Sequence, residues 1–371
     1  MKIPSYFNDF LSGIRLTDNQ VNDLITGHTT LRDRLYNDEN LSKIIVNTFL
    51  QGSYRRATAT RPKSGKRSDV DVVVVTNLDK EQYTPEEAHD LFIPFLEKHY
   101  KDKYRIQGRS LGIELSYVDL DLVVTAAPSE SQKALLEGES VASDISLDDL
   151  SEWTLSKSQT FPHDIRSETF LFFEKQANAA EWKTEPLYIP NRDAEQWDPT
   201  DPLSQIKWTW DKNKECNRHY VNVVKALKWW RRIDDPEGSH PKSYPLEHLI
   251  GQTCPAGIES VAEGITLTLE AIVNEYPTKP IMPDHGVPQH DVFGRLTDDE
   301  YNAFYERVQV AAVLAREALD AESVYDSATK WRQLFGSKFP EPPKPTKNNS
   351  NGQSGFTQRN DKTTIGGNRF A

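Results

Sequence analysis

The chain has 371 residues and a formal net charge of −12, with 37% hydrophobic residues, 27% charged residues and two cysteines. This mixture is typical of one large or two medium globular domains and excludes disorder of the whole chain. No apolar run approaches the roughly 18 residues that a membrane-spanning helix needs, and the N-terminus lacks the apolar segment of a secretion signal. Two lone cysteines suit a reducing compartment, so we expect a cytoplasmic protein without membrane association.

Charge is distributed unevenly along the chain. Six basic residues and no acid occur between Gly52 and Ser68, whereas residues 129–201 contain 16 acids and 6 bases. Affinity for long nucleic acids comes mostly from cations that replace the counterions around phosphates. The acidic balance therefore argues against stable nucleic-acid binding, while the basic segment can still hold a small anion.

Helices and strands alternate in the first half of the chain. Scattered apolar positions predict one or two amphipathic helices over residues 17–47. The four valines that begin at Val72 are β-branched and uninterrupted, which indicates a central strand buried on both faces. The other predicted elements are a strand at Ile45–Leu50, a short helix at Tyr54–Thr60, the valine strand at Val72–Thr76, a helix at Pro85–Tyr100, and strands at Ile113–Leu115 and Val118–Thr125.

The second half is predicted to be mostly helical. Two prolines in the segment Asp198–Pro202 indicate a boundary, because proline cannot continue a helix. The predicted helices are Asn217–Ile233, Pro245–Gly251, Ser260–Tyr276 and, with an interruption, Thr297–Phe335. We therefore expect a core domain over residues 1–202, a helical domain over 203–340 and a disordered tail over 341–371. Within the core, residues 129–201 are predicted to be an acidic insertion of long surface loops with a helix near Ile165–Ala180.

Carboxylates on two predicted strands form the first candidate site. Asp69 and Asp71 are two residues apart on an extended segment, so their side chains leave the same face of the strand. Two carboxylates this close repel each other unless a cation lies between them. Asp121 on the strand at Val118–Thr125 would complete a set of oxygen ligands that suits Mg²⁺, and Asp119 is the alternative ligand. Paired acids in other proteins are most often solvated edge residues, but a charge at a buried strand end is costly, which favours the metal site.

A turn between the first two strands is the second candidate site. Gln51, Gly52 and Ser53 end the strand at Ile45–Leu50 and precede a short helix. Glycine allows close backbone approach, and the N–H groups at the start of a helix point at whatever lies in the turn. The Ser53 hydroxyl would add a donor to a phosphate oxygen. A Gly-Ser pair alone is usually only a turn, but here it places anion donors at the same sheet edge as the carboxylates.

Two other arrangements are less favoured. Two histidines and two cysteines could be assembled into a zinc site, but their irregular spacing favours loop and core roles; they are His285, His290, Cys216 and Cys254. Four tryptophans could stack on RNA bases, but they are more simply explained as the core of the helical domain; they are Trp208, Trp210, Trp229 and Trp230.

The order of these motifs resembles the nucleotidyltransferase core of the DNA polymerase β superfamily. Further segments narrow the resemblance to the bacterial cGAS/DncV-like nucleotidyltransferases (CD-NTases), which are related to oligoadenylate synthases, and within them to clade D. The segments are FLQGSYRRATATRP, SDVDVVVVTNLD, YVDLDLVVTAAP, VVKALKWWRR, KSYPLEHLIG and DHGVPQHDV. The resemblance extends from the N-terminal helix to Phe339 and implies an α/β (α+β) fold. It consists of a polymerase β-like core with a twisted mixed sheet and a mostly helical C-terminal domain of the oligoadenylate synthase type.

The resemblance also implies roles for individual residues. Asp69, Asp71 and Asp121 match the carboxylates that hold two Mg²⁺ ions, for which Mn²⁺ can substitute, and are the implied catalytic residues. In the family the first two bridge both metals, and the third holds the metal that activates the acceptor hydroxyl. The residues implied to bind nucleotide are Gln51, Gly52, Ser53, Arg56, Lys225, Lys228, Ser243 and Tyr244. Among these, the two lysines match a basic pair that reaches the triphosphate, and the tyrosine matches a ring that stacks on the donor base.

The implied activity is template-independent synthesis of a cyclic oligonucleotide second messenger in anti-phage (CBASS) defence. Clade D implies a cyclic trinucleotide from ATP and GTP, such as cyclic AMP-AMP-GMP. The implied partners are a downstream effector that binds the product and ubiquitin-like conjugation enzymes that attach the chain end at Ala371 to another molecule. Ring size and base choice are not visible in the residues themselves.

Two alternatives stay open at the level of sequence. One is a transferase that adds a nucleotide to an RNA end or to a protein, as other members of the superfamily do. The other is an inactive nucleotide sensor, against which the three carboxylates argue because they would repel one another without a metal.

Overall fold

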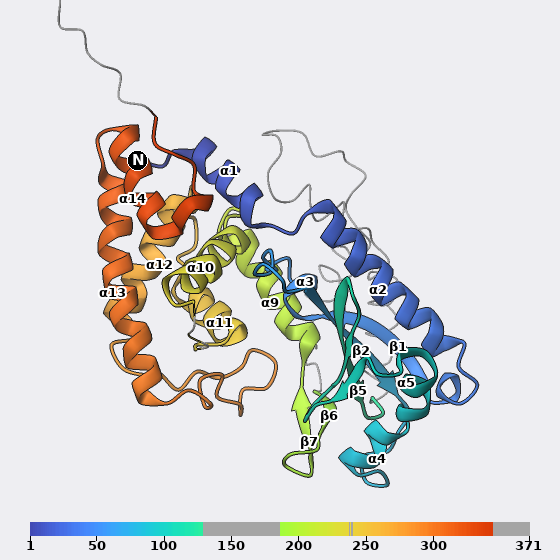
Figure 1. Cartoon of the computed structure of the whole chain (residues 1–371). Helices are drawn as coiled ribbons and strands as arrows, with labels where there is room; N and C mark the ends of the chain where they lie inside the picture. The colour runs from blue at the N-terminus through green and yellow to red at the C-terminus, as the bar shows by residue number, and fades with distance from the viewer. Residues whose placement is uncertain (129–185, 237, 239, 344–371) are drawn as a thin grey trace, which may run out of the picture.

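A computed structural model of the chain describes residues 1–128, 186–236, 238 and 240–343. The predicted helix near Ile165–Ala180, most of the predicted acidic insertion and most of the predicted tail lie outside these residues. Figure 1 shows the sheet with the helices α2, α4 and α5 on one side of the molecule and most of the remaining helices on the other. None of the helices in the described part of the chain combines the length and the apolar character needed to cross a bilayer.

The first half of the chain forms a five-stranded mixed sheet with the order β1-β2-β5-β4-β3. β2 and β5 are parallel, and the other neighbouring strands are antiparallel. The strands are β1 Ile45–Gln51, β2 Ser68–Thr76, β3 Tyr104–Ile106, β4 Leu111–Glu114 and β5 Val118–Thr125. The mixed sheet predicted from the sequence is thus confirmed.

The valine run of β2 is buried on both faces of the sheet, as predicted, because helices or other chain segments cover each face. Val72 and Val74 pack into a cluster with residues of α2 (Asp18–Tyr36) and α5 (Ile93–Tyr100). Val73 and Val75 point the other way, toward a smaller cluster that includes Leu187, Leu203 and Ile206. Odd-numbered residues of β2 therefore face away from α2, and this parity places Asp69 and Asp71 on the same face as Val73.

Helices form most of the second half, as predicted. Their bounds are α9 Pro202–Glu215, α10 Tyr220–Asp234, α11 Ser243–Thr253, α12 Val261–Glu275, α13 Asp298–Asp320 and α14 Val324–Phe335, with the short 3₁₀ helix η2 at Gly336–Lys338. The predicted interruption within Thr297–Phe335 lies between α13 and α14, where Ala321 leaves the helical conformation with ψ of 139°. Trp208, Trp229 and Trp230 pack with the core of these helices. Trp210 packs instead against the smaller cluster that includes Leu187, Leu203 and Ile206.

The family resemblance implies an N-terminal helix, and the structure has one at α1 (Pro4–Ile14), which packs with the helical half. Its Phe10 ring stacks on Phe335 of α14 with a centroid separation of 4.5 Å. The next helix, α2, packs on the sheet instead. Consecutive N-terminal helices therefore join opposite ends of the molecule, as Figure 1 shows.

Three local predictions were wrong. The helix expected at Tyr54–Thr60 is the four-residue α3 (Gly52–Arg55), because Ala57 adopts a left-handed backbone conformation with φ of 57° that ends it. The helix expected at Pro85–Tyr100 is split into α4 (Pro85–Asp90) and α5, because the proline in the first turn of α5 has no N–H to continue the ladder. The predicted loops near residue 200 contain the hairpin β6–β7, formed by Leu187–Asn191 and Gln196–Thr200. One further 3₁₀ helix, η1, spans Leu41–Lys43.

Candidate active site

The predicted carboxylates lie side by side on the two parallel strands of the sheet. Asp69 is paired in register with Asp119, and Asp71 is paired with Asp121. The shared face follows from the period of two along each strand. Asp69 is exposed, whereas Asp71 and Asp121 are half-buried where the strands enter the core. The arrangement joins four acidic side chains from two segments that are about 50 residues apart in the sequence.

Mutual repulsion is strongest at Asp71. Burial raises the pKa of the Asp71 carboxyl to about 7, and the neighbouring carboxylates Asp69 and Asp121 add to the rise. Burial and Asp69 also raise the pKa of Asp121. The side-chain amide of Gln107 opposes this by donating a hydrogen bond of 3.0 Å to Asp121 Oδ1. Ionised carboxylates in this arrangement need a compensating cation.

Asp119 has a different environment from Asp121. Arg67 donates from Nε to Asp119 Oδ1 over 2.7 Å, so this carboxylate already has a cationic partner. Asp121 instead accepts a hydrogen bond from the neutral amide of Gln107, and no ion pair joins it to a cation among the residues that the structure describes. This difference favours Asp121 over Asp119 as the third ligand of a metal.

The carboxylates fit a divalent cation through the chemistry of their donors. Carboxylate oxygens are the ligands that Mg²⁺ prefers, and the raised pKa of Asp71 indicates uncompensated negative charge. Within the residues that the structure describes, no three acidic, histidine or cysteine side chains are already gathered around one point. Ligands for an ion at this place would therefore be the paired strand residues, with their carboxylates turned toward it.

The Gly-Ser turn lies against Asp71. Gln51 ends β1 opposite Asp71 in the antiparallel register. Gly52 has φ of +75°, and a Cβ atom built on it would fall 1.9 Å from Asp71 Oδ2. Ser53 follows, with its backbone carbonyl accepting hydrogen bonds from the N–H groups of Thr58 and Ala59. The turn thus places Ser53 next to the carboxylates without a side chain at residue 52 to block the approach.

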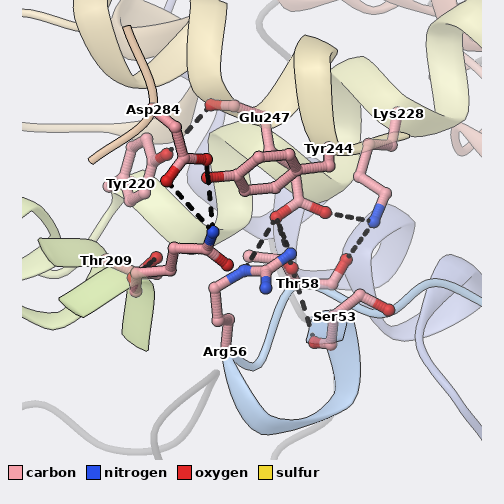
Figure 2. A network of polar contacts seen from close by, with 10 residues as sticks. Ser53, Arg56, Thr58, Thr209, Tyr220, Lys228, Tyr244, Glu247 and Asp284 are labelled. Atoms are coloured by element: carbon pink, nitrogen blue, oxygen red, sulfur yellow. Dashed lines mark hydrogen bonds and ion pairs between the residues drawn. The ribbon is translucent and has the colours of Figure 1, made fainter. Parts of the chain in front are cut away.

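A buried network connects this turn segment with the helical half, as Figure 2 shows. Glu247 of α11 accepts hydrogen bonds from Arg56 Nη2 at 3.2 Å, Thr58 Oγ1 at 2.9 Å and Lys228 Nζ at 2.7 Å. Lys228 also donates to the Thr58 backbone carbonyl over 3.1 Å. Burial alone would raise the pKa of Glu247, but Lys228 and Arg56 outweigh it and hold the pKa below its ordinary value.

Lys225 lies one helical turn before Lys228 and has no such partner. Its side chain is only 5% exposed, and no hydrogen bond or ion pair joins it to any of the described residues. Burial lowers the pKa of Lys225 well below its ordinary value, and the cations Arg15 and Lys228 lower it further. A buried amine among cations would be stabilised by an anion.

Tyr244 is held at its hydroxyl and at one face of its ring. The hydroxyl donates to Asp284, and the Arg56 guanidinium lies 5.3 Å from the ring centroid. Asp284 also accepts hydrogen bonds from the side chain of Gln205 and from the backbone of Gly286 at 2.8 Å. The exposed Ser243 directly precedes Tyr244 at the start of α11. The ring is therefore fixed before any ligand binds.

The structure brings the predicted residues together in two groups. One group contains Asp69, Asp71, Asp121 and the Gln51–Ser53 turn, and the other contains Arg56, Lys228 and Tyr244 around Glu247. Lys225 and Ser243 lie beside the second group in sequence, on α10 and α11, without a hydrogen bond or ion pair to it. Sequence reasoning missed Gln107, Thr58, Glu247 and Asp284 as contacts of the site. A signal existed for Glu247, because an acid among the apolar residues of a predicted helix requires a buried partner.

Comparison with known proteins agrees with this geometry. Residues 1–133 match the family model described as the Second Messenger Oligonucleotide or Dinucleotide Synthetase domain. A probable cyclic AMP-AMP-GMP nucleotide synthase from Salmonella paratyphi B is 48% identical over 359 residues, which cover 92% of this chain and 93% of that protein. A cyclic AMP-AMP-GMP synthase from Enterobacter hormaechei is also 48% identical, with the same coverage of both chains.

Solved structures show the same fold. A variant of the di-nucleotide cyclase DncV from Vibrio cholerae, solved in complex with ATP and GTP, has a TM-score of 0.63 and 14% sequence identity. The match covers 92% of this chain and 97% of the cyclase. With 48% identity over nearly its whole length to cyclic AMP-AMP-GMP synthases, the chain belongs to the cGAS/DncV-like nucleotidyltransferases, the CD-NTase family.

Proposed function

We propose that this protein is a template-independent nucleotidyltransferase that joins ATP and GTP into a cyclic trinucleotide, such as cyclic AMP-AMP-GMP. The observation that carries the proposal is the in-register pairing of Asp71 with Asp121 beside a Gly-Ser turn. The names of the two relatives at 48% identity support the product. The product would act as a second messenger in anti-phage defence by activating a separate effector. We expect this reaction in the cytoplasm, where its substrates are present.

Asp69, Asp71 and Asp121 would hold two Mg²⁺ ions, or Mn²⁺ in their place. Such ions stabilise charge on phosphates and lower the pKa of an acceptor hydroxyl. The chain's own residues would orient the substrate. Ser53 would donate to the triphosphate, and Lys225 would neutralise part of its charge. Neither the Ser53 hydroxyl nor the Lys225 ammonium group donates to another group among the described residues. Attack of a ribose hydroxyl on the α-phosphorus releases pyrophosphate, and a final intramolecular attack closes the ring.

The Tyr244 ring would stack on the base of the donor nucleotide. Stacking on an aromatic ring is worth about 1–3 kcal/mol per base and tolerates different bases. The hydrogen bond to Asp284 supports this role because it fixes the ring before a nucleotide arrives. Stacking of this kind cannot by itself distinguish ATP from GTP, so base choice requires other contacts.

The proposal is tested by incubating the purified protein with Mg²⁺ and four labelled nucleoside triphosphates, followed by phosphatase treatment and mass spectrometry. We expect a small phosphatase-resistant product whose mass corresponds to a cyclic trinucleotide of adenine and guanine. The Asp69→Asn/Asp71→Asn double variant should form none. A labelled macromolecule would instead identify a transferase acting on RNA or protein, and nucleotide binding without turnover would identify a sensor.

Attachment of the chain end at Ala371 to another molecule stays a prediction of the family resemblance. If the end of the chain serves only as a handle, deletion of the last few residues should leave synthesis intact. Loss of synthesis in the deleted protein would contradict that role.

A further inference from the structure

The two lysines that match the family's triphosphate-binding pair have different surroundings in this protein. Both are 5% exposed and lie on α10. Lys228 uses two of its three N–H donors on Glu247 Oε1, at 2.7 Å, and on the Thr58 carbonyl, at 3.1 Å. Lys225 has no hydrogen-bonding or ionic partner among the described residues. The two lysines are thus equally buried, but only the Lys228 ammonium group is compensated by partners within the protein.

Glu247 is the centre of a closed set of contacts between distant parts of the chain. Its Oε2 atom accepts from Arg56 and Thr58, which follow the Gly-Ser turn, and its Oε1 atom accepts from Lys228 of α10. The residues joined to Glu247 are up to 191 positions apart in sequence. Figure 2 shows these side chains converging on the carboxylate. A buried carboxylate with two cations and a hydroxyl has its charge compensated and its lone pairs occupied.

Arg56 extends the set to the nucleotide-stacking ring. The same guanidinium that pairs with Glu247 lies 5.3 Å from the centroid of the Tyr244 ring. Because Arg56 is held by a buried carboxylate, it supports one face of Tyr244. Glu247 thereby influences the ring without contacting a nucleotide.

We propose that Glu247 is a positioning residue whose buried pairing with Arg56 and Lys228 locks the turn segment to the helical half, and that Lys225, not Lys228, binds the triphosphate. The inference rests on the proposed nucleotidyltransferase function. The inference assigns Lys228 to the pairing with Glu247, whereas the family resemblance alone assigns both lysines to the triphosphate.

The test compares how tightly ATP and AMP bind, because the ratio of their dissociation constants isolates the contribution of the two outer phosphates. A non-hydrolysable ATP analogue and AMP are titrated calorimetrically in Mg²⁺ into wild type, Lys225→Met, Lys228→Met and Glu247→Gln. Lys225→Met should reduce the ratio of the AMP dissociation constant to that of the ATP analogue by about 10-fold or more, as expected for a lost charge-assisted hydrogen bond. Lys228→Met and Glu247→Gln should weaken both ligands and leave the ratio within about 3-fold of wild type.

Glu247→Gln is the decisive variant. If Lys228 is a phosphate ligand that Glu247 merely restrains, releasing it should raise affinity for the ATP analogue. A rise in that affinity, or a collapse of the ratio in Lys228→Met, would overturn the proposal. The double variant Lys228→Met/Glu247→Gln should bind the ATP analogue no more weakly than the weaker single variant, because both changes remove the same contact between Glu247 and Lys228. If the losses of affinity in the two single variants multiplied in the double variant, the proposal would also be overturned.

Two controls keep the result interpretable. Thr58→Val removes only one hydrogen bond to Glu247, so it tests the same contact if the variants that change a charge fail to fold. It should weaken the binding of the ATP analogue and of AMP by the same factor. A Thr58→Val protein that loses affinity for the ATP analogue alone would contradict the positioning role of Glu247. If wild type binds no ATP analogue, the proposed function itself fails, and this outcome is distinct from any pattern among the variants.

Discussion

The Asp71 carboxylate lies directly against Gly52, so close that a Cβ atom at residue 52 would fall 1.9 Å from Asp71 Oδ2. Gly52 also has φ of +75°, a conformation that costs other residues about 1–2 kcal/mol. The glycine of the turn is thus required twice, once by its backbone and once by the neighbouring carboxylate. No other residue type satisfies both conditions.

Replacing this glycine should damage activity more than stability. Gly52→Ala must displace Asp71, and we expect synthesis to fall by about 100-fold or more, as misplacement of reacting groups by about 1 Å can do. Gly65→Ala is the matched control, because Gly65 has φ of +77° and nothing within 4 Å of a built Cβ atom. Both variants should lose about 1–2 kcal/mol in denaturant unfolding from the backbone alone. Equal activity of the two variants would contradict the role of the close approach.

Neutralising Asp71 should stabilise the protein in the absence of metal. Its pKa of about 7 reflects burial and repulsion, so ionisation costs free energy in the folded state. Asp71→Asn should therefore raise the free energy of unfolding by about 2–4 kcal/mol at pH 8 in a chelating buffer. Asp119→Asn should not, because Asp119 is paired with Arg67. Denaturant melts of the two variants check this, and a destabilised Asp71→Asn would contradict it.

The same carboxyl predicts how stability depends on pH. Because the pKa of Asp71 is raised from 3.8 to about 7, the folded state holds more protons than the unfolded state between these values. The free energy of unfolding contributed by this group therefore falls as pH rises through that window and is level above it. Unfolding of the metal-free protein at pH 5, 6, 7 and 8 measures the trend. The difference between wild type and Asp71→Asn should grow with pH; a constant difference would contradict the assignment.

The two attachments of Tyr244 can be separated by mutation. Tyr244→Phe removes the hydrogen bond to Asp284 and keeps the ring, so the KM for ATP should change by less than about 5-fold. Tyr244→Ala removes the stacking surface, which should raise the KM by about 5- to 100-fold. Steady-state kinetics with both variants checks the difference. If the phenylalanine variant were as impaired as the alanine variant, the hydroxyl and not the ring face would be the essential feature.

Local pattern was sufficient for much of the core. A run of valines preceded by alternating aspartates determines which residues face each side of β2, because side chains alternate along a strand. The glycine of the turn and the helices of the second half also follow from neighbouring residues. These features depend on contacts a few positions apart, which the sequence displays directly.

Tertiary structure decided the rest. Pairing of Asp71 with Asp121, and the choice of Asp121 over Asp119 through Arg67, depend on the register between strands about 50 residues apart. Burial of Glu247 against Arg56 joins residues 191 positions apart. Such pairings arise because a buried charge must find a partner wherever the packed elements bring one. Periodicity shows that a side chain is buried, whereas only packing decides what lies beside it.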